Sequence, residues 1–178
     1  MKILVISDTH SNIKLVDSIF EIFKDDNIDT VIHCGDNLVD AKKLQKKYSN
    51  IKFYMVAGNC DPEGNGPEAI LEADIGGVHT MVVHGHKHYV NLNLDTLLSE
   101  AKESGAKLVA FGHTHIATVQ VRDGITIVNP GSLSQPRDGI YKSFAIVTIC
   151  NGVVNDVQMW QFTHKTEVTL NTKLQIVS

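Results

Sequence analysis

The chain has 178 residues, of which 43% are hydrophobic and 20% are charged, and its formal net charge is −4 at pH 7. This negative charge argues against a nucleic-acid backbone as the main ligand, because proteins that bind one usually carry a basic patch. The apolar run at Ile3–Ile6 is too short for a signal peptide, and no apolar stretch approaches the ~20 residues of a membrane span, so we expect a cytoplasmic protein with no membrane partner.

Strands and helices alternate in the first half of the chain. Short apolar runs predict three strands there: Ile3–Ile6, Thr30–Ile32 and Phe53–Val56. Apolar residues at helical spacing predict a helix over Ile13–Lys24 that Asn12 caps, and the composition of Asp40–Lys47 is also helical. Strands separated by helices of this length usually pair in parallel through right-handed crossovers.

The second half is richer in hairpins. Glycine-containing turns join three pairs of predicted strands: Ala69–Ile75 with Val78–Val83, Ala117–Val121 with Ile125–Val128, and Phe144–Ile149 with Val153–Phe162. A helix over Leu94–Glu103 ends at Gly105, and Leu108–Phe111 is a further strand. The whole pattern predicts an α/β fold, a four-layer αββα sandwich of two mixed β-sheets flanked by helices. We expect a single domain over residues 1–178, in which 166–178 is a tail that either adds an edge strand or is disordered.

Residues that commonly bind metals follow five of the apolar runs. The clusters are Asp8-Thr9-His10, Gly35-Asp36, Gly58-Asn59, His84-Gly85 and Gly112-His113-Thr114-His115. Because ligands in α/β sheets gather beyond the carboxyl ends of strands, the five clusters should converge on one edge. Carboxylate and amide oxygens mixed with imidazole nitrogens suit divalent Mn, Fe, Zn, Co or Ni, and they suit calcium poorly.

Each cluster also has an ordinary structural explanation. Asp8 and His10 taken alone can be a turn acid and a surface imidazole, the Gly-Asp and Gly-Asn pairs are common turns, and His84 can be a core histidine. Two histidines at one strand exit, His113 and His115, are less common. Five independent strand-to-turn junctions that all carry ligand types favour one shared metal site over coincidence.

The ordered motifs resemble those of the calcineurin-like metallophosphoesterase superfamily, from Lys2 to about Val147. The short chain without a cap domain, Gly58-Asn59-Cys60-Asp61 and Asn129-Pro130-Gly131-Ser132 are most similar to the small YfcE-type phosphodiesterase family. The resemblance implies two divalent ions per chain, with Mn expected first and Ni, Fe, Co or Zn as alternatives. It also implies a ligand set: Asp8, His10 and His115 for one ion, Asn59, His84 and His113 for the other, and Asp36 as the bridge between them.

Two-metal chemistry of this kind uses a bridging hydroxide that attacks phosphorus, while the cations offset charge on the phosphoryl oxygens. Asp36, Asn59, His84 and Cys60 are the residues expected at the catalytic centre. Cys60 stands where many superfamily members have a histidine that stabilises the transition state or protonates the leaving group. A thiol is a poorer proton donor, so Cys60 favours a phosphodiester substrate over a broad range of phosphomonoesters.

Two residues near the motifs keep several interpretations. Cys60 is either a small residue packed beside the metals or a redox-sensitive or nucleophilic thiol. With Cys34 and Cys150 it makes an odd set of isolated cysteines, which fits a reducing compartment. His86 is either a second contact to the site or to substrate phosphate, or a plain loop histidine, and the sequence slightly favours the loop.

We therefore expect a metal-dependent hydrolase that acts on a small phosphodiester. One alternative is a phosphomonoesterase of broad specificity in which His86 is the acid. Another is a protein-binding module like the retromer scaffold subunit, which shares this compact fold. Short hairpin edges such as Ile125–Val128 can pair between chains, which leaves a homo-oligomer open.

Overall fold

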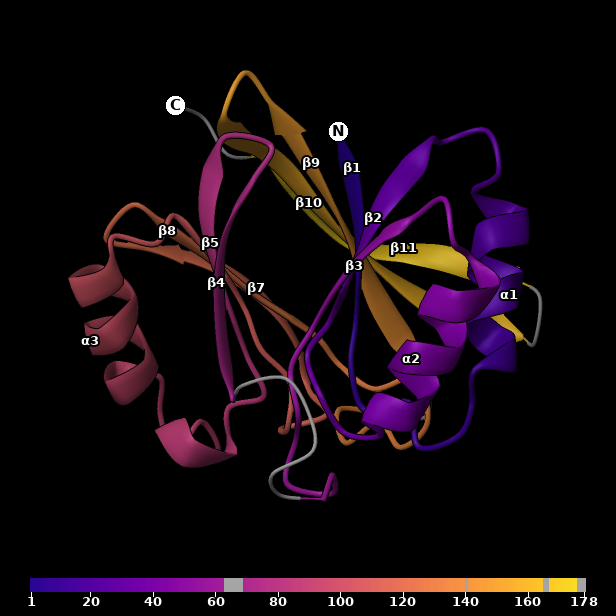
Figure 1. Ribbon diagram of the computed structural model, residues 1–178, viewed down its shortest axis with the longest axis horizontal. Helices are drawn as coiled ribbons and strands as arrows, with labels where there is room; N and C mark the ends of the chain where they lie inside the picture. Colours follow the sequence, from indigo (N-terminus) through magenta and orange to yellow (C-terminus); the bar gives the residue numbers. More distant parts are fainter. Residues whose placement is uncertain (63–68, 140, 165–166, 176–178) are drawn as a thin grey trace.

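Two β-sheets pack face to face in the computed structural model, which describes residues 1–62, 69–139, 141–164 and 167–175. Helices α1 (Lys14–Ile22) and α2 (Leu38–Lys47) lie outside one sheet, and α3 (Asp95–Ser104) lies outside the other (Figure 1). This arrangement confirms the predicted four-layer αββα class. Within the described residues, no helix is long and apolar enough to cross a membrane.

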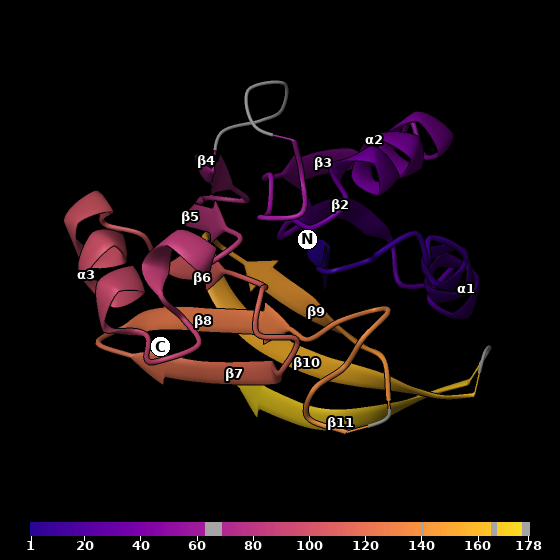
Figure 2. The same ribbon diagram turned by 90° about the horizontal axis from the view of Figure 1, so that it is seen from below.

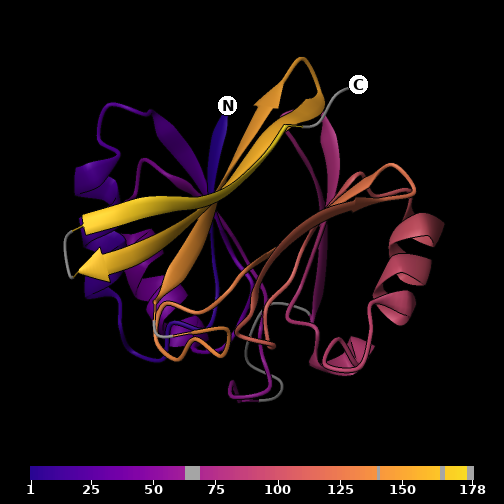
Figure 3. The same cartoon turned by 180° about the vertical axis from the view of Figure 1, so that it is seen from behind.

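The first sheet has six strands in the order β11-β10-β9-β1-β2-β3. Their bounds are β1 (Lys2–Ile6), β2 (Ile28–His33), β3 (Lys52–Met55), β9 (Ser143–Cys150), β10 (Val153–His164) and β11 (Glu167–Gln175). Strands β1, β2 and β3 are parallel, as their helical crossovers predict, whereas β9, β10 and β11 are joined by antiparallel pairing. Figure 3 shows the molecule from behind, with the long β10–β11 hairpin, in yellow, which forms one edge of the first sheet.

The second sheet has five strands in the order β4-β5-β6-β8-β7. Their bounds are β4 (Ile70–Ile75), β5 (Val78–Val83), β6 (Leu108–Ala110), β7 (Ala117–Arg122) and β8 (Ile125–Pro130). The short 3-10 helix η1 (His86–His88) follows β5. All three predicted hairpins form, and β5, β6 and β8 run parallel, so this sheet is mixed as well.

The predicted C-terminal tail forms a strand where the structure describes it. Glu167–Gln175 pairs with β10 as the edge strand β11, which is the first of the two outcomes left open for those residues, whereas 165–166 and 176–178 lie outside the described residues.

The predicted Asn12 cap is wrong. The residue preceding α1 is Ile13, and no side-chain hydrogen bond caps the helix. The Asn12 amide donates instead to the carbonyl of Leu133, at 2.9 Å, and so joins the start of α1 to a loop 121 residues away.

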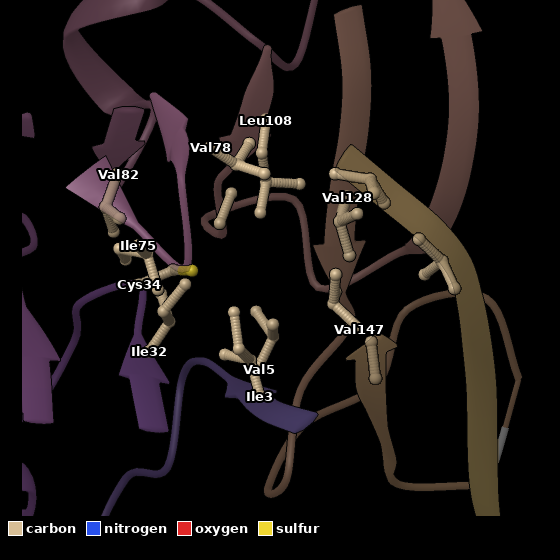
Figure 4. Packing of buried hydrophobic residues seen from close by; sticks show 14 of the residues in the cluster. Ile3, Val5, Ile32, Cys34, Ile75, Val78, Val82, Leu108, Val128 and Val147 are labelled. Carbon is tan, nitrogen blue, oxygen red and sulfur yellow. The ribbon is translucent and has the colours of Figure 1, made fainter. Parts of the chain in front are cut away.

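Strand β1 is buried on both faces. Its packing therefore fixes the position of its carboxyl end, which is followed by Asp8-Thr9-His10. Ile3 and Val5 pack between the sheets against residues of the second sheet, such as Val82 and Val128 (Figure 4). Leu4 and Ile6 point the other way, into the cluster beneath α1. Because burial of each such side chain stabilises the fold by about 1.5–3 kcal/mol, the core anchors the strand ends firmly.

Candidate metal centre

The five predicted clusters come to the same end of the two sheets. The loops that follow the parallel strands of the first sheet meet those that follow β5 and β6 at the lower end of Figure 1, and Figure 2 looks at the molecule from this end. Backbone hydrogen bonds join the loops directly. The amide of Asp8 donates to the Gly35 carbonyl at 3.1 Å, and the amide of Gly112 donates to the His84 carbonyl at 3.0 Å. Clusters from distant parts of the sequence therefore form one surface.

Asp8, His10, Asp36 and His115 come together as a candidate first ligand set. One ligand atom from each lies within 4.8 Å of the others. His115 Nε2 is 3.0 Å from Asp8 Oδ1, and His10 Nε2 is 3.8 Å from Asp36 Oδ2. Among the described residues, the buried His10 Nε2 has no hydrogen-bond partner. A buried nitrogen left unpaired costs about 1–3 kcal/mol, so this arrangement fits a cation that the four side chains surround.

The second predicted set meets the first at Asp36. His84 Nε2 lies 3.1 Å from Asn59 Oδ1 and 3.3 Å from Asp36 Oδ1. The His113 ring lies 5.1 Å from the His84 ring, at a steep angle of 72°. Asp36 thus turns one carboxylate oxygen toward His84 and the other toward His10, the position that a bridging ligand requires.

Two histidines are held in the tautomer that a metal ligand needs. His84 Nδ1 lies 2.8 Å from the Cys34 carbonyl, and His115 Nδ1 lies 2.6 Å from the Gln135 carbonyl. Because a carbonyl oxygen can only accept, each Nδ1 donates its hydrogen. The Nε2 atom of each neutral ring is then left with a lone pair, and these lone pairs face the oxygens of Asp8, Asp36 and Asn59. A proton or a cation must relieve that arrangement.

Without a bound cation, the electrostatics of the site act differently on its two strand-exit histidines, His115 and His113. The hydrogen bond with Asp8 raises the pKa of His115, although burial opposes it. Burial would raise the pKa of Asp8, but the His115 hydrogen bond and the charge of His84 outweigh it, so that pKa is lowered. Burial, and then the charge of His84, lower the pKa of His113 and favour the neutral ring that metal binding requires.

Backbone strain marks the same positions. Five of the seven predicted ligands are non-glycine residues with positive φ: Asp8 at 52°, His10 at 39°, Asp36 at 58°, His113 at 68° and His115 at 59°. Such conformations are uncommon, and each costs on the order of 1–3 kcal/mol unless its surroundings enforce it. Here hydrogen bonds enforce them, such as the 2.9 Å bond from Ser132 Oγ to the Asp8 carbonyl. Clustered strain of this kind is typical of functional sites.

Two glycines allow the loops to approach so closely. A Cβ atom at Gly58 would lie only 2.5 Å from the backbone nitrogen of Asp36 and would also collide with its carboxylate. A Cβ atom at Gly112 would collide with the Ser7 hydroxyl and lie 2.9 Å from Asp8 Oδ2. Glycine, which has no Cβ atom, is therefore required for the close backbone approach at both positions.

Sequence reasoning missed a buried chain of hydrogen bonds behind the first ligand set. The Gly35 amide donates to His33 Nδ1 at 3.2 Å, His33 Nε2 lies 3.3 Å from Thr9 Oγ1, and that hydroxyl donates to Asp40 Oδ2 at 2.9 Å. The Ser11 amide also donates to Asp40, at 2.7 Å. Because Thr9 lies between Asp8 and His10, this chain holds the loop that carries both ligands.

Asn91 was also missed. Its amide nitrogen is placed 2.9 Å from His113 Nε2. The amide group can turn to present its oxygen instead, so it can pair with either form of that nitrogen. The only sequence signal for Asn91 is its place in the loop after the His84 cluster, which does not predict this contact.

Cys60 lies beside Asp36, the predicted bridging residue. Its backbone amide donates to Asp36 Oδ1 at 3.0 Å, and the Asn59 amide lies 3.5 Å from its sulfur. Partial burial and then Asp36 raise the pKa of the thiol to about 11, so it stays protonated at neutral pH. A protonated thiol is a weak nucleophile, which disfavours the alternative of a nucleophilic Cys60.

His86 lies at the start of η1, and its ring faces the second ligand set. The ring centre is 5.4 Å from that of His84 and 6.1 Å from that of His113. Its Nδ1 atom is buried and has no hydrogen-bond partner among the described residues. This position beside the site fits the predicted contact to substrate better than it fits a plain loop histidine.

Comparisons with known proteins agree with this geometry. Residues 1–152 match the family model of the calcineurin-like phosphoesterase superfamily domain. The chain is 35% identical over 154 residues to the probable metallophosphoesterase YsnB of Bacillus subtilis, covering 85% of this chain and 86% of that protein. It is 31% identical over 156 residues to phosphodiesterase MJ0936 of Methanocaldococcus jannaschii, covering 79% and 89%.

Two further matches bear on the predicted fold and family. A crystal structure of a predicted phosphoesterase from Streptococcus pneumoniae superposes with a TM-score of 0.78 at 27% identity, covering 98% of this chain and 97% of that one. Phosphodiesterase YfcE of Escherichia coli is 24% identical over 169 residues, covering 83% and 87%, which confirms the predicted resemblance. The chain therefore belongs to the calcineurin-like phosphoesterase superfamily.

Proposed function

We propose that this protein is a phosphodiesterase that uses two divalent metal ions. The observation that carries the proposal is the position of Asp36, whose two carboxylate oxygens face His84 and His10 from opposite ligand sets. Relatives named metallophosphoesterase and phosphodiesterase support the same class of reaction.

The residues of the chain divide into two sets of ligands. Asp8, His10 and His115 would hold one ion, Asn59, His84 and His113 would hold the other, and Asp36 would contact both. When bound, such a pair of ions lowers the pKa of a shared water and offsets charge on the phosphoryl oxygens. Mn²⁺ is the first candidate for both positions, and Ni²⁺, Fe²⁺, Co²⁺ or Zn²⁺ suit the same donors.

The chain itself orients these ligands. The carbonyls of Cys34 and Gln135 keep the Nε2 atoms of His84 and His115 free of hydrogen. The Cys60 amide donates to Asp36 and so fixes the carboxylate that both sets share. Ordering by hydrogen bonds of this kind typically contributes 10–100-fold to metal affinity or activity.

The preference for a diester rests on Cys60. A histidine at this position could donate a proton to the leaving group, which typically contributes 10²–10⁴-fold. The Cys60 thiol, with its pKa raised to about 11 by partial burial and by Asp36, is a poor donor at neutral pH. Esters whose leaving group departs without a proton should therefore be hydrolysed best.

The test is hydrolysis of bis-p-nitrophenyl phosphate by the protein loaded with Mn²⁺. We expect turnover that a chelator abolishes and that Asp36→Ala reduces by roughly 10³-fold or more, since it removes a ligand of both ions. Asp25→Ala, the same change at an exposed position in the turn after α1, is the matched control and should keep full activity. Absence of turnover with each of Mn²⁺, Ni²⁺, Co²⁺, Fe²⁺ and Zn²⁺ would contradict the proposal.

The position of His86 favours one second candidate, a phosphomonoesterase in which this residue contacts the substrate. Its ring lies 5.4 Å from the His84 ring and could reach a phosphate held there. Rates with p-nitrophenyl phosphate and with the diester should be compared in the wild type and in His86→Ala. A monoester rate that exceeds the diester rate and falls selectively in His86→Ala would favour this candidate.

A protein-binding scaffold remains the other alternative from the sequence. The ligand set is complete in this chain, which favours an enzyme. His113→Ala separates the two, because a scaffold keeps its function without that ligand and an enzyme does not.

A further inference from the structure

A largely apolar pocket opens next to the candidate metal centre. It has a volume of about 190 Å³, and its walls include Val90, Leu94, Phe111 and Ile116, with Asn91 and Thr118 at polar positions. Val90 and Leu94 come from the segment between η1 and α3, Phe111 directly follows β6, and Thr118 belongs to β7. Segments on both sides of the His113 cluster therefore form one wall.

The pocket shares residues with the second ligand set. Asn91 lines it and also lies 2.9 Å from His113 Nε2. Thr114, which follows His113 in the chain, lines it as well, and Asn129 fixes that residue by donating to its hydroxyl at 2.9 Å. A group bound in the pocket would therefore lie directly beside the place where His113 would hold its ion.

The size and lining of the pocket define what fits it. A cavity of about 150 Å³ lined by Leu, Ile and Phe side chains is sufficient to bind benzene, so about 190 Å³ accommodates one aromatic ring. Three of its lining side chains, Val90, Leu94 and Phe111, also belong to the cluster beneath α3 or pack against it, so the wall is preformed. The charged side chains of the second sheet do not line it, which disfavours a charged occupant.

We propose that this pocket binds an aromatic ring carried by one arm of the phosphodiester, and that it selects aryl or pyrimidine-type esters over alkyl esters. The inference rests on the proposed phosphodiesterase function and names a substrate class for it. The phosphoryl group would lie at the ligand sets, and the ring would lie against Phe111 and Leu94.

The test compares two inhibitors that differ only in the ring. Benzylphosphonate holds its ring one CH₂ group from phosphorus, as an aryl ester holds it through oxygen, and ethylphosphonate lacks the ring. Against bis-p-nitrophenyl phosphate hydrolysis, benzylphosphonate should inhibit the wild type about tenfold more strongly or better, the scale on which apolar pockets discriminate.

A pair of variants on β7 assigns that difference to the pocket. Thr118→Phe places a ring in the pocket and should bring the two inhibition constants to within about twofold of each other. Gln120→Phe introduces the same phenylalanine two residues along the same strand, where the side chain does not line the pocket, and should keep the wild-type ratio. Phenylalanine suits a strand at both positions, so both variants should fold.

The outcomes separate this inference from the proposed function. If the enzyme hydrolyses the diester but both phosphonates inhibit equally, or if Thr118→Phe keeps the preference, the pocket assignment is overturned while the phosphodiesterase stands. If no diester is hydrolysed, the amide chemical shifts of Ile116 and Thr118 decide in zinc-loaded, ¹⁵N-labelled protein. If these amide shifts change with benzylphosphonate but not with ethylphosphonate, the result supports ring binding in the pocket. If they do not change with benzylphosphonate, the pocket assignment is overturned.

Discussion

The two ligand sets differ in how firmly the protein encloses them. In the first set, Asp8, Asp36 and His115 are each exposed by 4% or less, and His10 is partly exposed. In the second set, His84 is buried as well, but Asn59 is exposed and His113 is partly exposed, with the exposed Asn91 beside it. We call these the enclosed set and the open set, and we expect the enclosed set to hold its ion more tightly and the open set to be the side from which ions exchange and substrate arrives.

Neighbouring groups explain the difference. Behind the enclosed set, the chain from His33 through Thr9 to Asp40 is fully buried and its polar atoms are paired with one another. In front of the open set lie the η1 turn and the apolar pocket, which present fewer fixed partners. A ligand held by buried hydrogen bonds pays less ordering entropy when the ion binds, and this raises its affinity.

The largest effect should come from removing one ligand of each set. His115→Ala should weaken the tighter of two zinc-binding events, and His113→Ala should weaken the other. The zinc affinity of the affected event should fall by roughly 100-fold or more, since a direct ligand matters at least as much as its supporting groups. Isothermal titration calorimetry of the metal-free protein measures both events. Loss of the same event in both variants would break the distinction between an enclosed set and an open set.

His33 should give the enclosed set a characteristic response to acid. Its complete burial lowers its pKa to about 4, although the charges of Asp8, Asp61 and Asp40 oppose that shift. Between about pH 6.5 and 4, His33 is therefore protonated in the unfolded chain, where a histidine pKa is about 6.5, but stays neutral in the folded protein. Stability is fully present above pH 6.5 and should fall by about 3 kcal/mol as the pH drops through this window.

The measurement is the free energy of unfolding by urea, followed from pH 4 to 7 in the presence of a chelator. His33→Gln removes the titrating group, so its stability should vary less steeply with pH than that of the wild type, whatever its absolute value. Equal slopes for the two proteins would show that His33 is not buried as a neutral side chain.

Much of this organisation can be predicted from the sequence, because it depends on local signals. Short apolar runs followed by ligand residues locate the strand ends, and glycine-containing turns locate the hairpins. The missed contacts join segments that the local pattern cannot relate: Thr9 to Asp40 across 31 residues, and Asn91 to His113 across 22. Asparagine is a residue that commonly caps helices, but the side-chain amide of Asn12 bonds to the distant Leu133 carbonyl and does not cap α1.

Gly58→Ala should disturb both ligand sets at once, through the residue that they share. The new Cβ atom would collide with the carboxylate and backbone of Asp36, and overpacking of this kind costs typically about 1–3 kcal/mol. Activity on the diester should fall with it, since Asp36 must shift. Gly105→Ala is the control: its Cβ atom meets nothing within 4 Å, so although its backbone φ of 78° makes the variant somewhat less stable, it should keep full activity. A fully active Gly58→Ala would contradict the shared role of Asp36.

The smallest effect should come from the contact between helices α1 and α2, which lies away from the ligand sets. Asp17 on α1 accepts hydrogen bonds from the Tyr48 hydroxyl at 2.6 Å and from Lys47 at 2.7 Å, both at the end of α2. Burial works against ionisation of Asp17, but these two partners outweigh it and lower its pKa, so the contact stabilises the fold above the unfolded pKa of about 4 and is lost in more acidic solution.

Tyr48→Phe should therefore cost only about 1 kcal/mol in unfolding free energy at pH 7, as expected for one partly exposed hydrogen bond. The tighter zinc-binding event should keep its affinity, because buried hydrogen bonds next to the ligands, and not this remote helix contact, hold Asp8 and His10. A weaker first zinc event in Tyr48→Phe would mean that the enclosed set depends on how α1 and α2 are clamped together. The contrast between the two sets would then arise from the helix layer and not from the His33 chain.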